Sequence, residues 1–162
     1  MGVIIAAYIC SIFAINILGR GFVNFDMYSD IELARYIALE NTLFPEGWHF
    51  GNQIYTVATP VVASLAYRLV GDAYLSMAIA SCFMTTICII SFVWCVKPFV
   101  TPRNIIVGLL VFVGGTNIAR SAYGDWEGLQ LFFTMASYYS CYVIGILITL
   151  GVWCRYKAGI PV

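Results

Sequence analysis

Long apolar stretches separated by short polar ones predict four membrane-spanning helices in this chain. A helix needs about 20 apolar residues to cross the hydrocarbon core of a bilayer. Residues 73–96 and 129–154 carry no charged side chain over at least that length, and residues 2–19 and 104–119 are slightly shorter apolar stretches. The pattern therefore predicts an all-α polytopic membrane protein, with residues 1–162 forming a single transmembrane domain.

The apolar stretch 54–70 is predicted to form a helix that lies at the membrane interface or is partly re-entrant. Pro60 would break a spanning helix here, or would start a new helix in its first turn. Gly71 can end this helix in the left-handed conformation, and Asp72 can then cap the span that follows. Counting 54–70 as a full span would also put the acidic loop and the loop at Lys97 on the same side.

The outer loop 20–72 is predicted to contain a second interfacial helix. Ser29 to Glu32 reads as a capping box, S-x-x-E, which predicts a helix from Asp30 to about Asn41. Its apolar residues recur at helical spacing, so we expect it to lie flat on the membrane with that face down. Pro45 and Gly47 would stop it before the aromatic rings of the Trp48-His49-Phe50 segment.

Composition supports an integral membrane protein. Hydrophobic residues make up 62% of the chain and charged residues 10%, whereas a soluble domain has about 25% charged residues. The net charge is zero, which gives no indication of nucleic-acid binding. The six cysteines lie in apolar runs without a CxxC pair, so they are interpreted as small apolar residues.

The charge distribution predicts the orientation. Lys97 and Arg103 flank the loop between the second and third spans, Arg155 and Lys157 follow the fourth, and no acidic residue accompanies them. Because Lys and Arg accumulate on cytoplasmic loops, we expect both termini in the cytoplasm, the long first loop outside, and insertion in the plasma membrane. The predicted outer side carries all eight carboxylates and four arginines: Asp26, Asp30, Glu32, Glu40, Glu46, Asp72, Asp125, Glu127, Arg20, Arg35, Arg68 and Arg120.

Two carboxylates stand out as candidate catalytic groups, and each has a plain alternative. Asp26 falls in the turn where the first span leaves the bilayer, where partial desolvation would make a carboxylate a better base; alternatively it is a solvated loop residue. Asp30 is the second choice, but its charge also suits the start of a helix.

Four further residues are candidates for binding an anionic substrate: Arg35, His49, Arg68 and Arg120. The three arginines lie on the predicted outer side, where they could face a leaving phosphate. Arg68 could instead extend to the lipid headgroups, and His49 could be a hydrogen-bonding ring at headgroup level. No HxxxH or paired-cysteine pattern predicts a metal site.

Residues 21–72 resemble the start of the GT-C superfamily of membrane glycosyltransferases, which includes protein O-mannosyltransferases and aminoarabinose transferases. The shared features are an aspartate just after the first span, a surface helix, the turn TLFPEGW, and a proline-containing apolar helix ending at Gly71-Asp72. The resemblance implies transfer of a sugar from a polyprenyl phosphate or diphosphate donor, with Asp26 as base or as a residue that orients acceptor and metal. It leaves open whether a divalent cation is needed.

The chain is shorter than GT-C enzymes, which have more spans and usually a soluble outer domain. We therefore expect it to be an N-terminal portion of such an enzyme, completed by further spans or by a partner membrane subunit. Two alternatives remain: a non-catalytic multi-span subunit and a transporter fragment. The second is disfavoured because transporters place ionisable groups at mid-membrane depth, and the predicted spans carry essentially none.

Overall fold

The computed structural model describes residues 25–49, 58–111 and 140–161, with short stretches near the N-terminus (2–3, 6–7, 9–10 and 13). The side chains of residues 25–27 lie outside this description. All regular secondary structure in the described residues is helical, which confirms the all-α part of the predicted fold class. The predicted span 2–19 falls largely outside the described residues.

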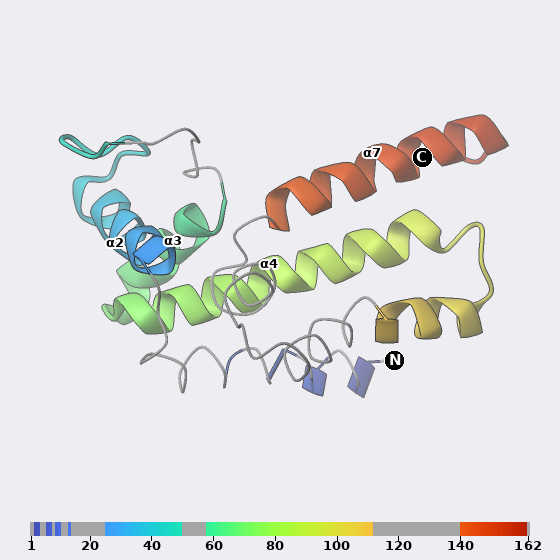
Figure 1. Ribbon diagram of the computed structural model, residues 1–162, viewed down its shortest axis with the longest axis horizontal. Helices are drawn as coiled ribbons and strands as arrows, with labels where there is room; N and C mark the ends of the chain where they lie inside the picture. Colours follow the sequence, from blue (N-terminus) through green and yellow to red (C-terminus); the bar gives the residue numbers. More distant parts are fainter. Residues whose placement is uncertain are drawn as a thin grey trace.

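Helix α4, Ala73–Val96, is the longest described helix and contacts all the labelled helices around it (Figure 1). Its bounds are those predicted. Asp72 caps its first turn, because the Asp72 Oδ1 atom accepts a hydrogen bond from the backbone N–H of Leu75 at 2.7 Å. This bond satisfies one of the amides that a helix start leaves without a partner, so the predicted cap is confirmed.

Helix α3, Thr59–Val70, lies immediately before α4. Pro60 is in its first turn, where a missing backbone N–H costs nothing. Gly71 ends the helix with φ 68°, a conformation that glycine adopts without a Cβ clash. The stop at Gly71 is confirmed. Of the two alternatives for Pro60 the start of a helix is found, so α3 begins at Thr59 and not at residue 54, and its 12 residues are too few to cross a membrane alone.

Helix α2, Phe25–Glu40, starts earlier than predicted and ends within one residue of the predicted end at about Asn41. The helix already includes Phe25, so Ser29 lies in its interior and the predicted capping box is wrong. It ends at Glu40, because Asn41 takes the left-handed conformation with φ 55°. Asn tolerates this conformation better than most residues do, and the stop therefore precedes Pro45 and Gly47.

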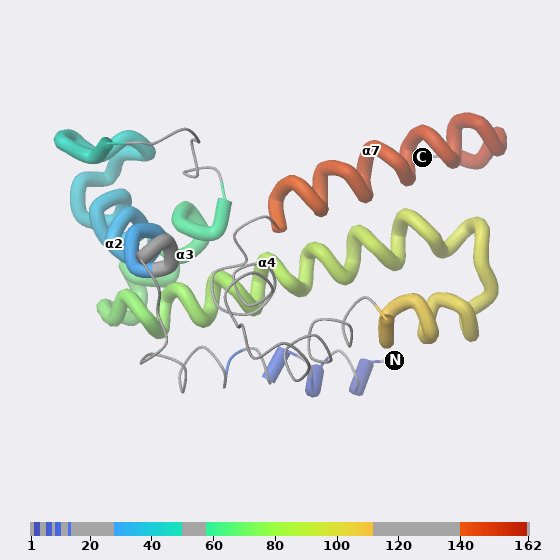
Figure 2. The backbone as a smooth tube through the Cα atoms, in the orientation of Figure 1, coloured from blue at the N-terminus to red at the C-terminus, as the bar shows by residue number. Residues whose placement is uncertain are grey.

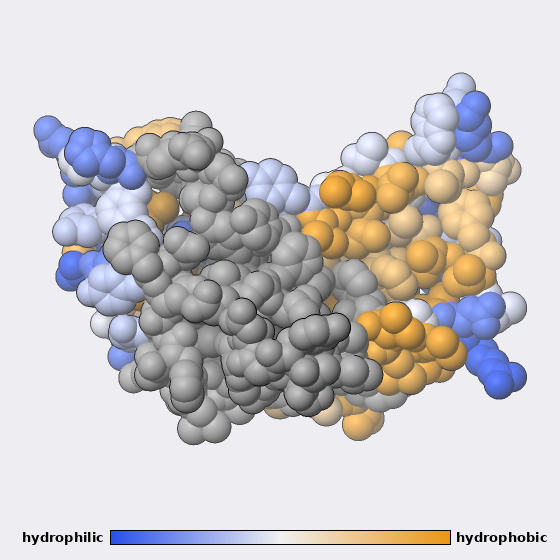
Figure 3. Space-filling view, in the orientation of Figure 1, coloured by the Kyte–Doolittle hydropathy of each residue, from blue (hydrophilic) through white to orange (hydrophobic). Residues whose placement is uncertain are grey.

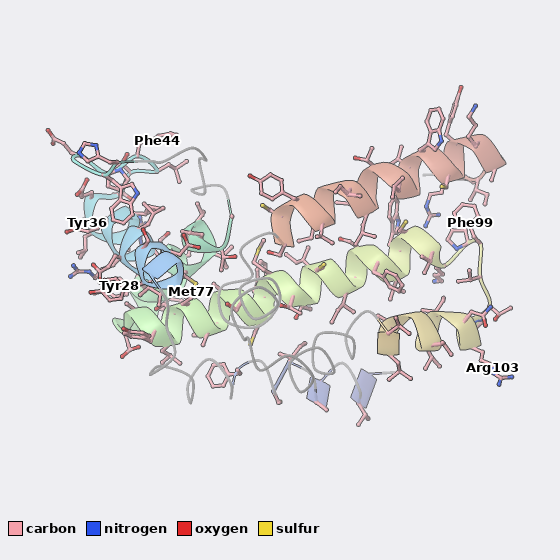
Figure 4. The ribbon with its side chains drawn as sticks, in the orientation of Figure 1. Tyr28, Tyr36, Phe44, Met77, Phe99 and Arg103 are labelled. Atoms are coloured by element: carbon pink, nitrogen blue, oxygen red, sulfur yellow. The ribbon has the colours of Figure 1, made fainter. Side chains whose placement is uncertain are left out.

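The apolar face of α2 packs against protein. Ile31 and Ala34 form one buried cluster with Ala63 of α3 and with Met77 and Ala80 of α4. The expectation that this face lies on the membrane is therefore wrong. The face is used to dock α2 on the first half of α4, and Figure 4 shows Met77 at this junction.

The second half of α4 is flanked by α7, Ser140–Ala158, and by the short helix Pro102–Val111. Figure 2 follows the backbone from α4 through residues 97–101 into the short helix, which doubles back, while α7 runs in the same direction as α4. Two glycines permit α7 and the short helix to approach α4 closely. A Cβ on Gly151 would overlap the Trp94 ring, and one on Gly108 would lie 3.1 Å from the Phe92 ring.

Two described helices, α4 and α7, are long and apolar enough to cross a membrane. The predicted spans 104–119 and 129–154 overlap helix 102–111 and α7, but residues 112–139 lie outside the described part. Helix α7 continues to Ala158, so Arg155 and Lys157 lie in its last turn, directly after the predicted span 129–154. Apolar surface covers α7 and helix 102–111, with hydrophilic residues beyond it and over α2 (Figure 3).

Candidate functional site

The acidic end of the molecule is formed by α2, the loop 41–49, the last turn of α3 and the Asp72 cap of α4. It brings together candidate residues that are far apart in sequence, and it lies at the left of Figure 1. Four of the six candidates (Asp30, Arg35, His49 and Arg68) have described side chains at this end. Their contacts decide what each can do.

Asp30 is buried, with 4% of its side-chain surface exposed. It lies one turn from Ala34 on the face of α2 that docks on α3 and α4. A carboxylate enclosed in this way must have polar partners, because burying an unpaired charge is costly. The expectation that Asp30 marks the start of the helix is wrong, since the helix begins at least five residues earlier.

Asp26 lies on the helical backbone of α2, in the turn before Asp30. The prediction placed it in a loop before the helix, and that placement is wrong. Positions 26 and 30 are i and i+4 on one helix, which puts them on the same face. The side chain of Asp26 lies outside the described part, so the contacts of the first-choice base stay a prediction.

Arg35 is engaged by its neighbour Glu32. The Arg35 Nε donates to Glu32 Oε2 at 3.0 Å, and Nη2 lies 2.8 Å from the same oxygen. This hydrogen bond and the Glu32 charge raise the pKa of Arg35 above its ordinary value. The guanidinium also lies over the Tyr36 ring, 5.4 Å from its centroid. A bound phosphate would therefore have to compete with Glu32 for this arginine.

Arg68 joins the ends of two helices. Its Nη2 donates to the side-chain oxygen of Asn41, Oδ1, at 2.8 Å. Asn41 ends α2 and Arg68 lies in the last turn of α3, so the bond joins segments 27 residues apart. Arg68 is exposed, and the bond to a neutral amide leaves its charge uncompensated by this partner.

The loop 41–49 is held by local contacts, and His49 is exposed at its end. The backbone N–H of Glu46 donates to Glu40 Oε2 at 2.8 Å, and the N–H of Trp48 donates to the carbonyl of Pro45 at 3.2 Å. The Trp48 ring packs against Tyr36 with ring centroids 5.8 Å apart. Figure 4 shows Tyr36 on α2 below Phe44 in this loop.

Arg120 lies outside the described residues, as do the two carboxylates near it, Asp125 and Glu127. The described part therefore does not test whether that loop faces the acidic end. Among the described side chains, no three His, Cys, Asp or Glu residues come together as metal ligands.

Sequence reasoning missed two polar contacts between helices. Asn41 had no assigned role beyond the helix end, and Arg155 was interpreted only as a flanking cation. Arg155 is in fact buried, with 9% exposure, and its Nη2 donates to the backbone carbonyl of Trp94 at 2.7 Å. Pro98 was the available signal, because it lies four residues after Trp94 and has no N–H for that carbonyl.

Comparison with known proteins gives no relative: no family model, no curated protein and no solved structure matches this chain.

Proposed function

We propose that this chain is an integral membrane protein whose acidic end faces the outside of the plasma membrane. The support is the surface of the helices. Large apolar side chains are exposed along α7 and helix 102–111, where an aqueous protein would cover them. Lipid is the environment in which such surfaces are stable. In this arrangement both termini are cytoplasmic and four spans cross the bilayer.

We further propose that the acidic end takes part in sugar transfer from a polyprenyl-phosphate donor. The observation that carries this proposal is the placement of Asp26 and Asp30 one turn apart on α2, beside the first turns of a candidate span. A lipid-linked donor presents its sugar at this level. Asp26 would take the proton of the acceptor hydroxyl as the acceptor oxygen bonds to the sugar and the sugar–phosphate bond breaks.

Positive charge has to meet the leaving phosphate. In the proposed site Arg68 is the available group, because its hydrogen-bond partner among the described residues is the neutral Asn41 side chain. Asp26 and Asp30 are oxygen donors of the kind that divalent cations bind.

The test is sugar transfer in membranes that contain the full chain. Polyprenyl-phosphate-linked mannose, labelled in the sugar, is supplied, and labelled protein and lipid products are counted. We expect Asp26→Asn to abolish transfer while membrane insertion stays normal. Glu46→Gln is the matched control, since Glu46 is exposed in the loop 41–49. Normal transfer by Asp26→Asn overturns the assignment of the base.

A non-catalytic membrane subunit is the second candidate. Two observations favour it: Arg35 is already paired with Glu32, and apolar faces of α7 remain exposed where further helices could pack. In this case the chain would show no transfer by itself, and the charge substitutions at the acidic end would change neither transfer nor insertion. Co-purification of a second membrane protein with the full chain would then be expected.

A further inference from the structure

The end of the molecule opposite the acidic end is wholly basic in the described residues. Lys97 follows α4, Arg103 opens the short helix Pro102–Val111, and Arg155 and Lys157 lie in the last turn of α7. No carboxylate side chain of the described part lies at this basic end. Figure 4 shows Phe99 in the connection that follows α4, and Arg103 at the same end of the molecule.

Arg155 holds the two long helices together at this end. Its guanidinium lies 4.4 Å from the Trp94 ring centroid and donates to the Trp94 carbonyl, so the last turns of α4 and α7 are at the same level. Gly151, one turn earlier on α7, leaves room for the same ring. The contact thereby brings the end of α4, which Lys97 follows, and the last turn of α7, which carries Lys157, to the same end of the molecule.

Exposed aromatic rings accompany these charges. Trp153 and Tyr156 are 57% and 72% exposed, and Phe99 is also exposed. The Lys157 Nζ atom lies 4.9 Å from the centroid of the Trp153 ring. Tryptophan and tyrosine concentrate at headgroup level, where one part of the ring is apolar and another polar. The basic end thus combines cations with rings suited to the lipid–water boundary.

We propose that this basic end binds the phosphate headgroups of anionic phospholipids, selecting them over zwitterionic lipids. The exposed charges of Lys97, Arg103 and Lys157 contact the phosphates. Buried Arg155 holds the last turn of α7, which carries Lys157, against the end of α4. The inference rests on the proposed membrane insertion and goes beyond it, because insertion alone requires no preference among lipids. Each cation near an anionic surface contributes about a five-fold gain in binding.

The test is native mass spectrometry of the full chain in detergent, titrated with phosphatidylglycerol or phosphatidylcholine. We expect the wild-type chain to bind phosphatidylglycerol about ten-fold more tightly than phosphatidylcholine. The triple variant Lys97→Gln, Arg103→Gln, Lys157→Gln should lose this preference while its helical circular dichroism is unchanged. Arg35→Gln with Arg68→Gln removes charge at the acidic end and should keep the preference.

Equal affinity of the wild-type chain for the two lipids overturns the inference, as does an unchanged preference in the triple variant. A parallel flotation assay with vesicles of each lipid separates this failure from failure of the proposed function. Chain that floats with both kinds of vesicle but shows no lipid preference leaves membrane insertion standing. Chain that stays in the aqueous fraction with both overturns insertion and lipid selection together.

Discussion

At the residue scale, a proline determines which group donates a hydrogen bond to the Trp94 carbonyl at the end of α4. In a regular helix the Trp94 carbonyl would accept from the N–H of residue 98, but Pro98 has none. Arg155 donates to this carbonyl from α7. The arginine thus compensates for a missing backbone donor on another helix, although its own Nε atom is buried without a hydrogen-bond partner among the described atoms.

We predict that the cost of removing Arg155 depends on Pro98. Arg155→Met should lower the free energy of unfolding by about 1.5–3 kcal/mol, the range for hydrogen bonds to charged groups. With Pro98→Ala in place, residue 98 has an N–H that can reach the Trp94 carbonyl, so the same substitution should cost about 1 kcal/mol less. Unfolding by SDS in mixed micelles measures the four proteins of this cycle. An equal cost in both backgrounds would contradict the assigned role.

At the scale of the element, the helix ends that were predicted correctly depend on residues adjacent to them. Pro60, Gly71 and Asp72 each start or end a helix by affecting backbone groups no more than three positions away. Such local effects can be predicted from the order of residues along the chain. The S-x-x-E pattern at Ser29 misled because the same letters occur inside a helix, and the start of α2 lies further back.

Which surface a helix face meets could not be predicted from periodicity. The apolar spacing in α2 is the same whether its face meets lipid or protein. Only the fold shows that Ala63, Met77 and Ala80 cover Ile31. The Arg68–Asn41 and Arg155–Trp94 bonds were likewise unpredictable, because they join residues 27 and 61 positions apart. The contacts of the candidate residues with distant parts of the chain were therefore not predicted, and their functional roles stay a prediction.

The docking of α2 predicts a contrast between two of its residues. Ile31→Ala empties a buried site and should lower the free energy of unfolding by about 2–5 kcal/mol. Leu39→Ala on the same helix removes a side chain that is 63% exposed. This substitution should change the free energy of unfolding by about 0.5 kcal/mol or less. SDS unfolding of the purified chain compares them. Two small, equal effects would mean that α2 rests on the membrane.

At the scale of the whole molecule, the described charges are divided between two ends. The acidic end contains the described carboxylates and also Arg35 and Arg68, whereas the basic end contains both lysines of the chain. Arginine therefore occurs at both ends and lysine at only one. Chemistry that distinguishes lysine from arginine can report which end faces the cytoplasm.

We predict that a membrane-impermeant amine reagent will not label the chain on intact cells. Lys97 and Lys157 lie at the proposed cytoplasmic end, and the predicted cytoplasmic N-terminus is protected in the same way. Both lysines are exposed, so labelling should be strong once the cells are permeabilised. Mass spectrometry of the purified chain locates the labelled amines.

Glu46→Lys supplies the control, because it puts an exposed amine in the loop 41–49 at the other end. That variant should be labelled at position 46 on intact cells and at the two natural lysines only after permeabilisation. Labelling of the two natural lysines on intact cells, and of position 46 only after permeabilisation, would show the opposite orientation. Asp26 and Asp30 would then lie on the cytoplasmic side. The proposed donor would then have to be presented on the inner leaflet, since both carboxylate positions lie on α2, which docks on the first half of α4.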